Sequence, residues 1–255
     1  MEIIESSSNR TIKYVKSLQV RKNRQQNGEF VVEGLRFSKE AFESGWEISK
    51  LIVSQEFREF DKNWGIEPII VSEKLFAEIS ETENPQGILV VVKFPQINEM
   101  PANAKSVVFL DCIQDPGNMG TIVRSADAFG FDAVIVSEKC VDIYNSKTLR
   151  ATMGSIFHIP VYMGGSSEEI MEKLKMNGYL TYAAHLNGTP LEMTMKREKI
   201  ALIIGNEANG ISDIVTKKAD FLVKIPMRGK AESLNASVAA GILLYEIASL
   251  NFSEN

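Results

Sequence analysis

The sequence is poor in the side chains that most often bind metals or act as nucleophiles. It has only two cysteines and two histidines among 255 residues. Cys112 and Cys140 lie in or beside apolar segments, so we expect two buried thiols and no disulfide framework. His158 and His185 fall in different predicted segments, and we expect no metal site.

Long apolar runs and a strong charge imbalance are also missing. No run reaches the length of a membrane span, and the acidic start, Met1-Glu2-Ile3-Ile4-Glu5, lacks the layout of a signal peptide. We therefore expect a cytoplasmic protein without membrane contact. The net charge of −5 argues against broad coating of nucleic acid, although it leaves room for a local basic patch.

One such patch lies near the start of the chain. Six cations crowd into a short stretch: Arg10, Lys13, Lys16, Arg21, Lys22 and Arg24. They could form the solvated face of a helix. Alternatively, they could contact phosphates, because several cations on one element release counterions from a nucleic acid.

The pattern along the chain predicts two α/β domains, covering residues 1–98 and 105–255. Residues 93–106 carry two prolines and little apolar periodicity, which indicates a linker. Before it, short β-rich runs alternate with helical patterns, which predicts a small α/β domain. After it, strands are predicted at 107–110, 133–136, 159–162, 180–183, 201–204 and 221–225, with helices near 119–129, 167–177 and 234–250. This alternation predicts a mainly parallel sheet covered on both faces.

The first of three glycine-punctuated blocks follows the strand at 107–110. Asn118 is a candidate N-cap for the next helix, and Gly120 permits a close approach to its first turn. Arg124 lies off the apolar stripe of this helix. It could simply pair with Asp127 three residues later. The Gly-x-Gly-x-x-Gly fingerprint of dinucleotide binding is absent, which argues against a nucleotide-dependent oxidoreductase.

The second and third blocks follow later strands. Gly205 ends a strand, and Asn206 to Gly210 turn the chain before Ser212, a candidate helix cap; the glycines could serve backbone geometry alone. In the third block Pro226 stops a strand, and Ser233-Leu234-Asn235 lead into a long helix. Leu234, Val238, Ile242 and Tyr245 share one face of that helix, which could serve the core or a dimer interface.

Taken together, the blocks resemble the SpoU family of RNA 2′-O-ribose methyltransferases, members of the SPOUT class. The motifs occur in order as Asn118-x-Gly120-x-x-x-Arg124-x-Ala126, then Gly205-x-Glu207-x-x-Gly210-x-Ser212, then Ile225-Pro226-Met227-x-Gly229 with Ser233-Leu234-Asn235-x-Ser237. Residues 9–37 resemble the N-terminal substrate-binding domain of many members. Ala236 stands where the family usually has valine.

The resemblance implies the fold and the partners. It implies an N-terminal L30e-like RNA-binding domain and a C-terminal α/β domain with a trefoil knot, which forms a homodimer. The knot would hold S-adenosylmethionine through main-chain groups of Gly205, Ile225 and Leu234, with Met227 and Asn235 nearby.

The resemblance also implies methyl transfer to a ribose 2′-hydroxyl, with Arg124 essential and Asn118, Glu207, Ser233 and Asn235 assisting. No histidine falls in the blocks to act as the base, and a guanidinium is always protonated, so the identity of the base stays open. The extra N-terminal domain favours 23S ribosomal RNA as the substrate. A transfer RNA substrate, or a noncatalytic RNA-binding protein on the same fold, are the alternatives.

Overall fold

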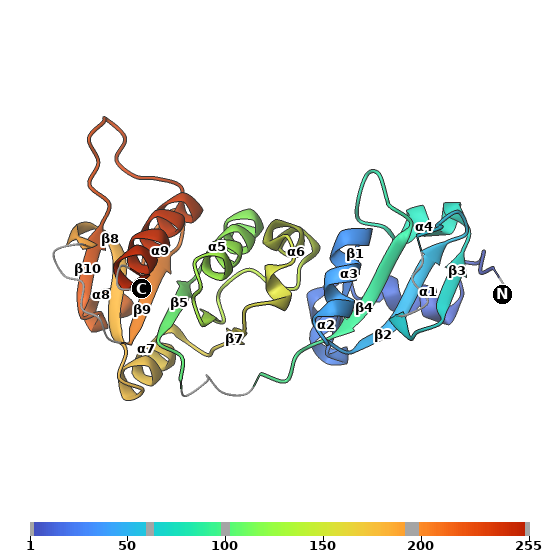
Figure 1. Cartoon of the computed structure of the whole chain (residues 1–255), viewed down its shortest axis with the longest axis horizontal. Coiled ribbons are helices and arrows are strands. Elements are labelled where there is room, and N and C mark those ends of the chain that lie inside the picture. Colours follow the sequence, from blue (N-terminus) through green and yellow to red (C-terminus); the bar gives the residue numbers. More distant parts are fainter. Residues whose placement is uncertain (1–2, 60–63, 98–102, 192–198, 253–255) are drawn as a thin grey trace. The chain divides into compact units, whose positions relative to one another are not determined.

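The computed structural model of the chain describes residues 3–59, 64–97, 103–191 and 199–252. Contacts divide the chain into two compact units (Figure 1). Unit 1 comprises Met1–Gln96 with Tyr144–Leu149, and unit 2 comprises Ile97–Ile143 with Arg150–Asn255. The main division lies inside the predicted linker, whereas the segment Tyr144–Leu149, within the predicted second domain, belongs to unit 1.

Unit 1 is built on a mixed four-stranded sheet in the order β1-β4-β2-β3. The pairs β1/β4 and β4/β2 are antiparallel, and β2/β3 is parallel. Its elements are α1 (Arg10–Ser17), α2 (Arg21–Asn27), β1 (Glu29–Glu33), α3 (Leu35–Glu43), β2 (Ile48–Ser54), β3 (Pro68–Val71), α4 (Glu73–Ile79) and β4 (Ile88–Lys93).

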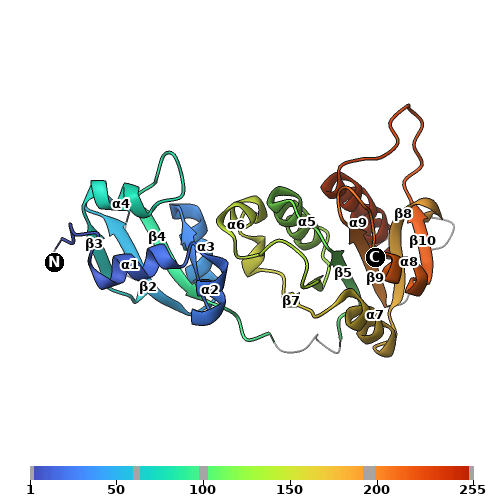
Figure 2. The same ribbon diagram turned by 180° about the vertical axis from the view of Figure 1, so that it is seen from behind.

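The core of unit 1 forms because β4 is apolar on both faces. Leu89 and Val91 pack with Ile12 and Val15 of α1 and with Phe76 of α4. Figure 2 shows α1 lying across the sheet. On the other face of the sheet, α3 packs against β4 and β1 (Figures 1 and 2). The predicted small α/β domain is therefore present in the fold of this unit.

Unit 2 contains a six-stranded, entirely parallel sheet in the order β10-β8-β9-β5-β6-β7. Its strands are β5 (Ser106–Asp111), β6 (Ala133–Val136), β7 (Val161–Met163), β8 (Leu180–Pro190), β9 (Ile200–Gly205) and β10 (Phe221–Lys224). Its helices are α5 (Pro116–Ala128), α7 (Ser167–Met176), α8 (Asp213–Lys218) and α9 (Ala236–Phe252), with a 3-10 turn at Ser155–Phe157; α6 (Ser146–Thr152) extends from unit 1 into unit 2.

Helices cover both faces of this sheet, as parallel strands require. Val107 and Phe109 of β5 and Ile203 of β9 belong to one core with Ile170 of α7 and Val215 of α8. On the other face α9 packs on β9 and on α5, and α5 packs on β6. Every strand predicted for this unit is present, although β8 is longer than predicted and β7 begins later.

The predicted cap of α5 was wrong. Helix α5 begins at Pro116, because proline suits the first helical position and the Asp115 side chain caps the helix by accepting the Asn118 amide at 2.7 Å. Asn118 therefore lies inside the helix and is not its cap. On α9 the buried face comprises Ala240, Leu243, Leu244 and Ile247, whereas the apolar face predicted to serve the core or a dimer interface is partly exposed at Val238 and Tyr245, so these two residues are not part of the core. Among the described residues, no helix has the length and apolar character of a membrane span.

Candidate functional site

The first two sequence blocks meet at the carboxyl ends of β5 and β9. From β5 the chain adds β6 and β7 on one side, then crosses to add β8, β9 and β10 on the other. Asp111, the last residue of β5, pairs in register with Gly205, the last residue of β9. Open α/β sheets bind ligands at the carboxyl edge where the strand order reverses. The fold therefore places both blocks at the expected position for a binding site.

Glu207 connects the two blocks. One carboxylate oxygen, Oε1, accepts the Asn118 side-chain amide at 3.0 Å and the Asp115 backbone amide at 3.1 Å, while Oε2 accepts the Gln114 amide at 3.2 Å. Burial by itself would raise the pKa of Glu207, but the hydrogen bonds from Asn118 and these amides lower it below its usual value. Glu207 is therefore ionised at neutral pH, and it fixes the start of α5 against the 205–212 turn.

Residues 205 to 212 form a tight turn, named here the 205–212 turn, in which the end of the turn packs against its start. A Cβ atom added to Gly205 would lie 2.2 Å from the Ile211 nitrogen and 2.4 Å from the Gly210 oxygen. Only glycine permits this approach, because the opposing atoms are backbone. Asn206 donates its side-chain amide to the Cys112 carbonyl at 2.9 Å. The turn therefore presents the main chain of β9 in one fixed geometry.

Arg124 lies on the solvent side of α5. Its side chain is exposed, and the predicted pair with Asp127 is not formed. Asp127 instead lies 3.3 Å from the His158 ring nitrogen Nδ1. No ion pair of Arg124 occurs within the described ranges of the chain. The guanidinium is accordingly free to contact an anionic ligand.

The third block extends away from the first two. Figure 1 shows the segment between β10 and α9 as a long loop. Asn235 caps α9 by accepting the Ser237 amide at 2.9 Å and the Ser237 hydroxyl at 2.6 Å. Ser233 is exposed, Met227 is partly exposed, and Ile225 and Leu234 are half-buried. The structure thus brings Asn118 and Glu207 together, while none of the described contacts joins Ser233 or Asn235 to Arg124.

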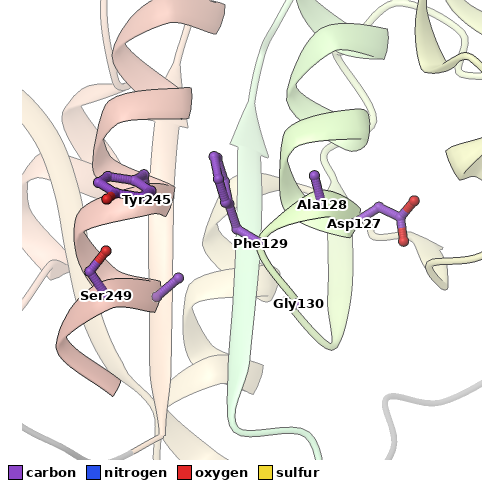
Figure 3. A pocket seen from close by; sticks show the side chains of 7 residues that line it. Asp127, Ala128, Phe129, Gly130, Tyr245 and Ser249 are labelled. Carbon is purple, nitrogen blue, oxygen red and sulfur yellow. The ribbon is translucent and has the colours of Figure 1, made fainter. Parts of the chain in front are cut away.

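A pocket of about 430 Å³ lies between the end of α5 and α9 (Figure 3). Phe129 and Tyr245 line it with Ala248 and Ser249, and their rings are 5.7 Å apart in an edge-to-face arrangement. Figure 3 shows Asp127 pointing away from these rings. Tyr245 is 59% exposed and Val238 is 50% exposed, so the face of α9 beside the pocket is apolar and accessible.

The six cations of the predicted basic patch divide into three kinds. Arg10, Lys13, Arg21 and Lys22 are exposed. Lys16 pairs with Glu78 at 3.2 Å. The interpretation of Arg24 as a phosphate contact is wrong for this conformation, because its side chain is only 4% exposed and donates to the Leu18 and Gln19 carbonyls. Within the described chain, no group of three or more His, Cys, Asp or Glu residues could hold a metal ion.

Comparison with known families explains this arrangement. The model of the SpoU rRNA Methylase family matches residues 105–245, which cover most of unit 2 and include the blocks that Glu207 and Asn118 join. The chain belongs to the SpoU family. The model of the MRM3-like substrate binding domain matches residues 9–90, so the SpoU-family chain also carries an N-terminal substrate-binding domain. The resemblance and the α/β fold with a mainly parallel sheet are both confirmed.

Relatives and solved structures cover almost the whole chain. A Bacillus subtilis protein named 23S rRNA (guanosine(2553)-2'-O)-methyltransferase RlmP is 39% identical over 97% of this chain and 99% of that one. A Streptomyces viridochromogenes 23S rRNA (uridine(2479)-2'-O)-methyltransferase is 32% identical over 89% of this chain and 84% of that one. The crystal structure of an AdoMet-bound rRNA methyltransferase from Sinorhizobium meliloti superposes with a TM-score of 0.87, at 30% identity and with 98% of each chain covered.

In this SpoU-family chain, sequence reasoning missed Asp111 and Cys112. Cys112 adopts a positive φ of 62°, and its carbonyl accepts Asn206. Asp111 is fully buried and accepts the Ser212 amide at 2.7 Å. The one available signal was a carboxylate directly after a buried apolar strand, and this signal does not reveal partners that are distant in the sequence.

Proposed function

We propose that the protein transfers a methyl group from S-adenosylmethionine to a ribose 2′-hydroxyl of ribosomal RNA, with 23S rRNA as the favoured substrate. The observation that supports this most is the tie between Glu207 and Asn118, which joins two family motifs at the switch point of the parallel sheet. The named relatives matched over nearly the whole chain act on 23S rRNA. We propose the cytoplasm as the compartment of the enzyme, which a ribosomal RNA substrate would suit. The L30e-like fold of unit 1 and the trefoil knot of unit 2 stay predictions.

The cofactor would be held at the carboxyl ends of β9 and β10. Main-chain groups of Gly205, Ile225 and Leu234 would bind it, with Met227 and Asn235 nearby. The residues suit this role for two reasons. Backbone packing fixes the 205–212 turn, and Gly205 has no side chain that could block access to its main-chain groups. Bound S-adenosylmethionine supplies a methyl group activated on a sulfonium.

Arg124 would act on the RNA. Its exposed guanidinium is permanently protonated, so it suits binding a phosphate beside the ribose and stabilising the developing alkoxide. Glu207 is occupied by Asn118 and two backbone amides, which makes it a positioning residue for the start of α5. Ser233 and Asn235 would approach the ribose from the third block, while Asn235 also caps α9.

The protein would act as a homodimer through the α5/α9 face of unit 2. Val238 and Tyr245 expose apolar surface there, beside the pocket that Phe129 lines. We expect Tyr245→Lys to convert a dimer into monomers in sedimentation velocity. Leu186→Lys, which charges an exposed apolar position on β8, is the matched control and should stay dimeric. A monomeric wild-type protein would contradict the proposal.

Unit 1 would bind RNA through the exposed cations of α1 and α2. The double variant Lys13→Ala/Lys22→Ala should weaken binding of an rRNA fragment and reduce the salt slope of log K by about 2, since each phosphate contact contributes about one. Lys39→Ala/Lys74→Ala removes two exposed cations elsewhere on the same unit and serves as the control. Equal slopes for the two double variants would exclude this surface.

The function itself is tested by mapping ribose methylation. RNA from cells with and without the protein is analysed by mass spectrometry, and one 2′-O-methyl group of 23S rRNA should be missing in the second sample. A methyl group missing from transfer RNA would support the alternative substrate. If no methyl group is missing and calorimetry detects no S-adenosylmethionine binding, the noncatalytic alternative is correct.

A further inference from the structure

Asp111 is a buried carboxylate that the proposed chemistry does not use. It ends β5, and its side chain is fully buried. No Lys, Arg or His within the described part of the chain forms an ion pair with it. Burying a charge without an opposite charge is costly unless hydrogen-bond donors compensate. The hydrogen-bond donors around Asp111 therefore indicate which segments the carboxylate holds together.

Three donors from three segments converge on this carboxylate. The Ser167 hydroxyl donates to Oδ1 at 2.5 Å, and the Cys112 thiol lies 3.4 Å from the same oxygen. The Ser212 amide donates to Oδ2 at 2.7 Å. Asp111 thereby joins the end of β5 to the first residue of α7 and to the last residue of the 205–212 turn.

The bond to Ser212 closes the far end of the 205–212 turn. Ser212 precedes α8, yet its hydroxyl is buried without a partner within the described residues and does not cap the helix. The hydrogen bond that holds Ser212 is therefore the one from its backbone amide to Asp111. Ile211, one residue earlier, lies against Gly205, so a shift of Ser212 would disturb the contact that shapes the end of β9.

We propose that Asp111 is a positioning residue that fixes the 205–212 turn for cofactor binding. Because its side chain is fully buried, it would act through the Ser212 amide on the main chain of Gly205 and not by direct contact with the cofactor or the RNA. This inference rests on the proposed function, because Gly205 is there assigned to S-adenosylmethionine.

The test is Asp111→Asn, which keeps the shape and removes one acceptor. The new Nδ2 group either faces the Ser212 amide, which then loses its acceptor, or donates to the Ser167 oxygen and leaves Ser212 a neutral amide oxygen. The bond to the Ser212 amide is weakened in both cases, because an ionised acceptor is lost. We expect the calorimetric Kd for S-adenosylmethionine to rise about tenfold. The KM for S-adenosylmethionine should rise with it while the KM for RNA stays unchanged.

Asp132→Asn is the matched control. Asp132 accepts the Lys105 and Ser106 amides at 2.8 Å each and the Ser106 hydroxyl at 3.1 Å, and so performs the same chemistry at the opposite end of β5. We expect the Kd of Asp132→Asn for S-adenosylmethionine to stay within about twofold of wild type, even if its melting temperature falls as far as that of Asp111→Asn. All binding is measured well below both melting temperatures.

Hydrogen exchange provides a readout that needs no cofactor. In the free protein the Ser212 amide should exchange faster in Asp111→Asn than in wild type, and at an unchanged rate in Asp132→Asn. If Asp111→Asn does not fold, Ser167→Ala replaces it, and should raise the Kd about threefold because the Ser212 bond remains.

The outcomes separate the two claims. A wild-type protein that binds no S-adenosylmethionine overturns the proposed function. Normal binding by wild type together with an unchanged Kd in Asp111→Asn overturns the positioning role of Asp111 alone. If Ser167→Ala is used instead, the same conclusion requires that both the Kd and the exchange rate of the Ser212 amide are unchanged.

Discussion

The two edges of the parallel sheet use the same chemistry over different distances. At the amino edge, Asp132 accepts an amide 26 residues away and Asp220 accepts the Thr181 amide 39 residues away. At the carboxyl edge, Asp111 and Glu207 reach partners 101 and 89 residues away. Carboxylates at the amino edge thus fix the starts of neighbouring strands, whereas those at the carboxyl edge gather segments from distant parts of the chain. Long-range polar ties mark the edge that carries the proposed site.

The largest expected effect at the carboxyl edge is that of Arg124→Ala. The methylation rate should fall roughly 100- to 1,000-fold, because the variant loses a cation placed for the transition state. The melting temperature should not change, since the side chain is exposed. Lys105→Ala removes an exposed cation at the amino edge and should leave the rate unaltered. A near-normal rate for Arg124→Ala would remove Arg124 from the mechanism.

Glu207→Gln should have the next largest effect. We expect the methylation rate to fall roughly tenfold and the free energy of unfolding to fall by about 1 kcal/mol, because one amide donor loses its acceptor. The pKa of Glu207 is lowered in the folded state, so its stabilisation is complete above the unfolded pKa and disappears as pH falls through the folded value. Urea unfolding at neutral pH and below about pH 4 should show the gap between variant and wild type closing in acid. A gap that persists in acid would contradict the hydrogen-bond role of the carboxylate.

Asp220→Asn should have the smallest effect on function. The carboxylate accepts the Thr181 amide at 3.0 Å and the Thr181 hydroxyl at 2.6 Å. Burial alone would raise the pKa of Asp220, but the Thr181 bonds and nearby Lys175 lower it, so its contribution to stability is also lost in acid. Unfolding free energy should fall by about 1 kcal/mol at neutral pH, with calorimetric S-adenosylmethionine affinity unaltered. A loss of affinity comparable to that of Asp111→Asn would erase the difference between the two edges.

Much of the fold was predictable because its signals are local. The apolar run of β6, Ala133–Val136, gave its bounds correctly, and Gly205 marked the end of β9. The start of α5 was missed, since proline both breaks chains and begins helices, and only the Asp115 cap decides between these.

The site was less predictable, because its decisive contacts are not local. The family motifs identified Asn118 and Glu207, but Asp111 has no sequence signal for a partner 101 residues away. Arg24 was misassigned because its charge matches that of its exposed neighbours. Only the folded structure shows that carbonyls at the end of α1 take up its guanidinium.

The strand order also has a consequence for synthesis of the chain. β5 pairs with β6, made shortly after it, and with β9, which begins at Ile200. While residues 112–199 are being translated, one edge of an apolar strand has no native neighbour. At typical synthesis rates this interval lasts roughly 4–18 s. An unpaired strand edge is accessible to other chains and to protease. We therefore expect nascent chains stalled before Ile200 to be cut by protease near β5. Chains stalled well after Gly205 should be protected. The pairing of β9 with β5, which brings the first two blocks together, would therefore also end the period in which this edge of β5 is open to protease.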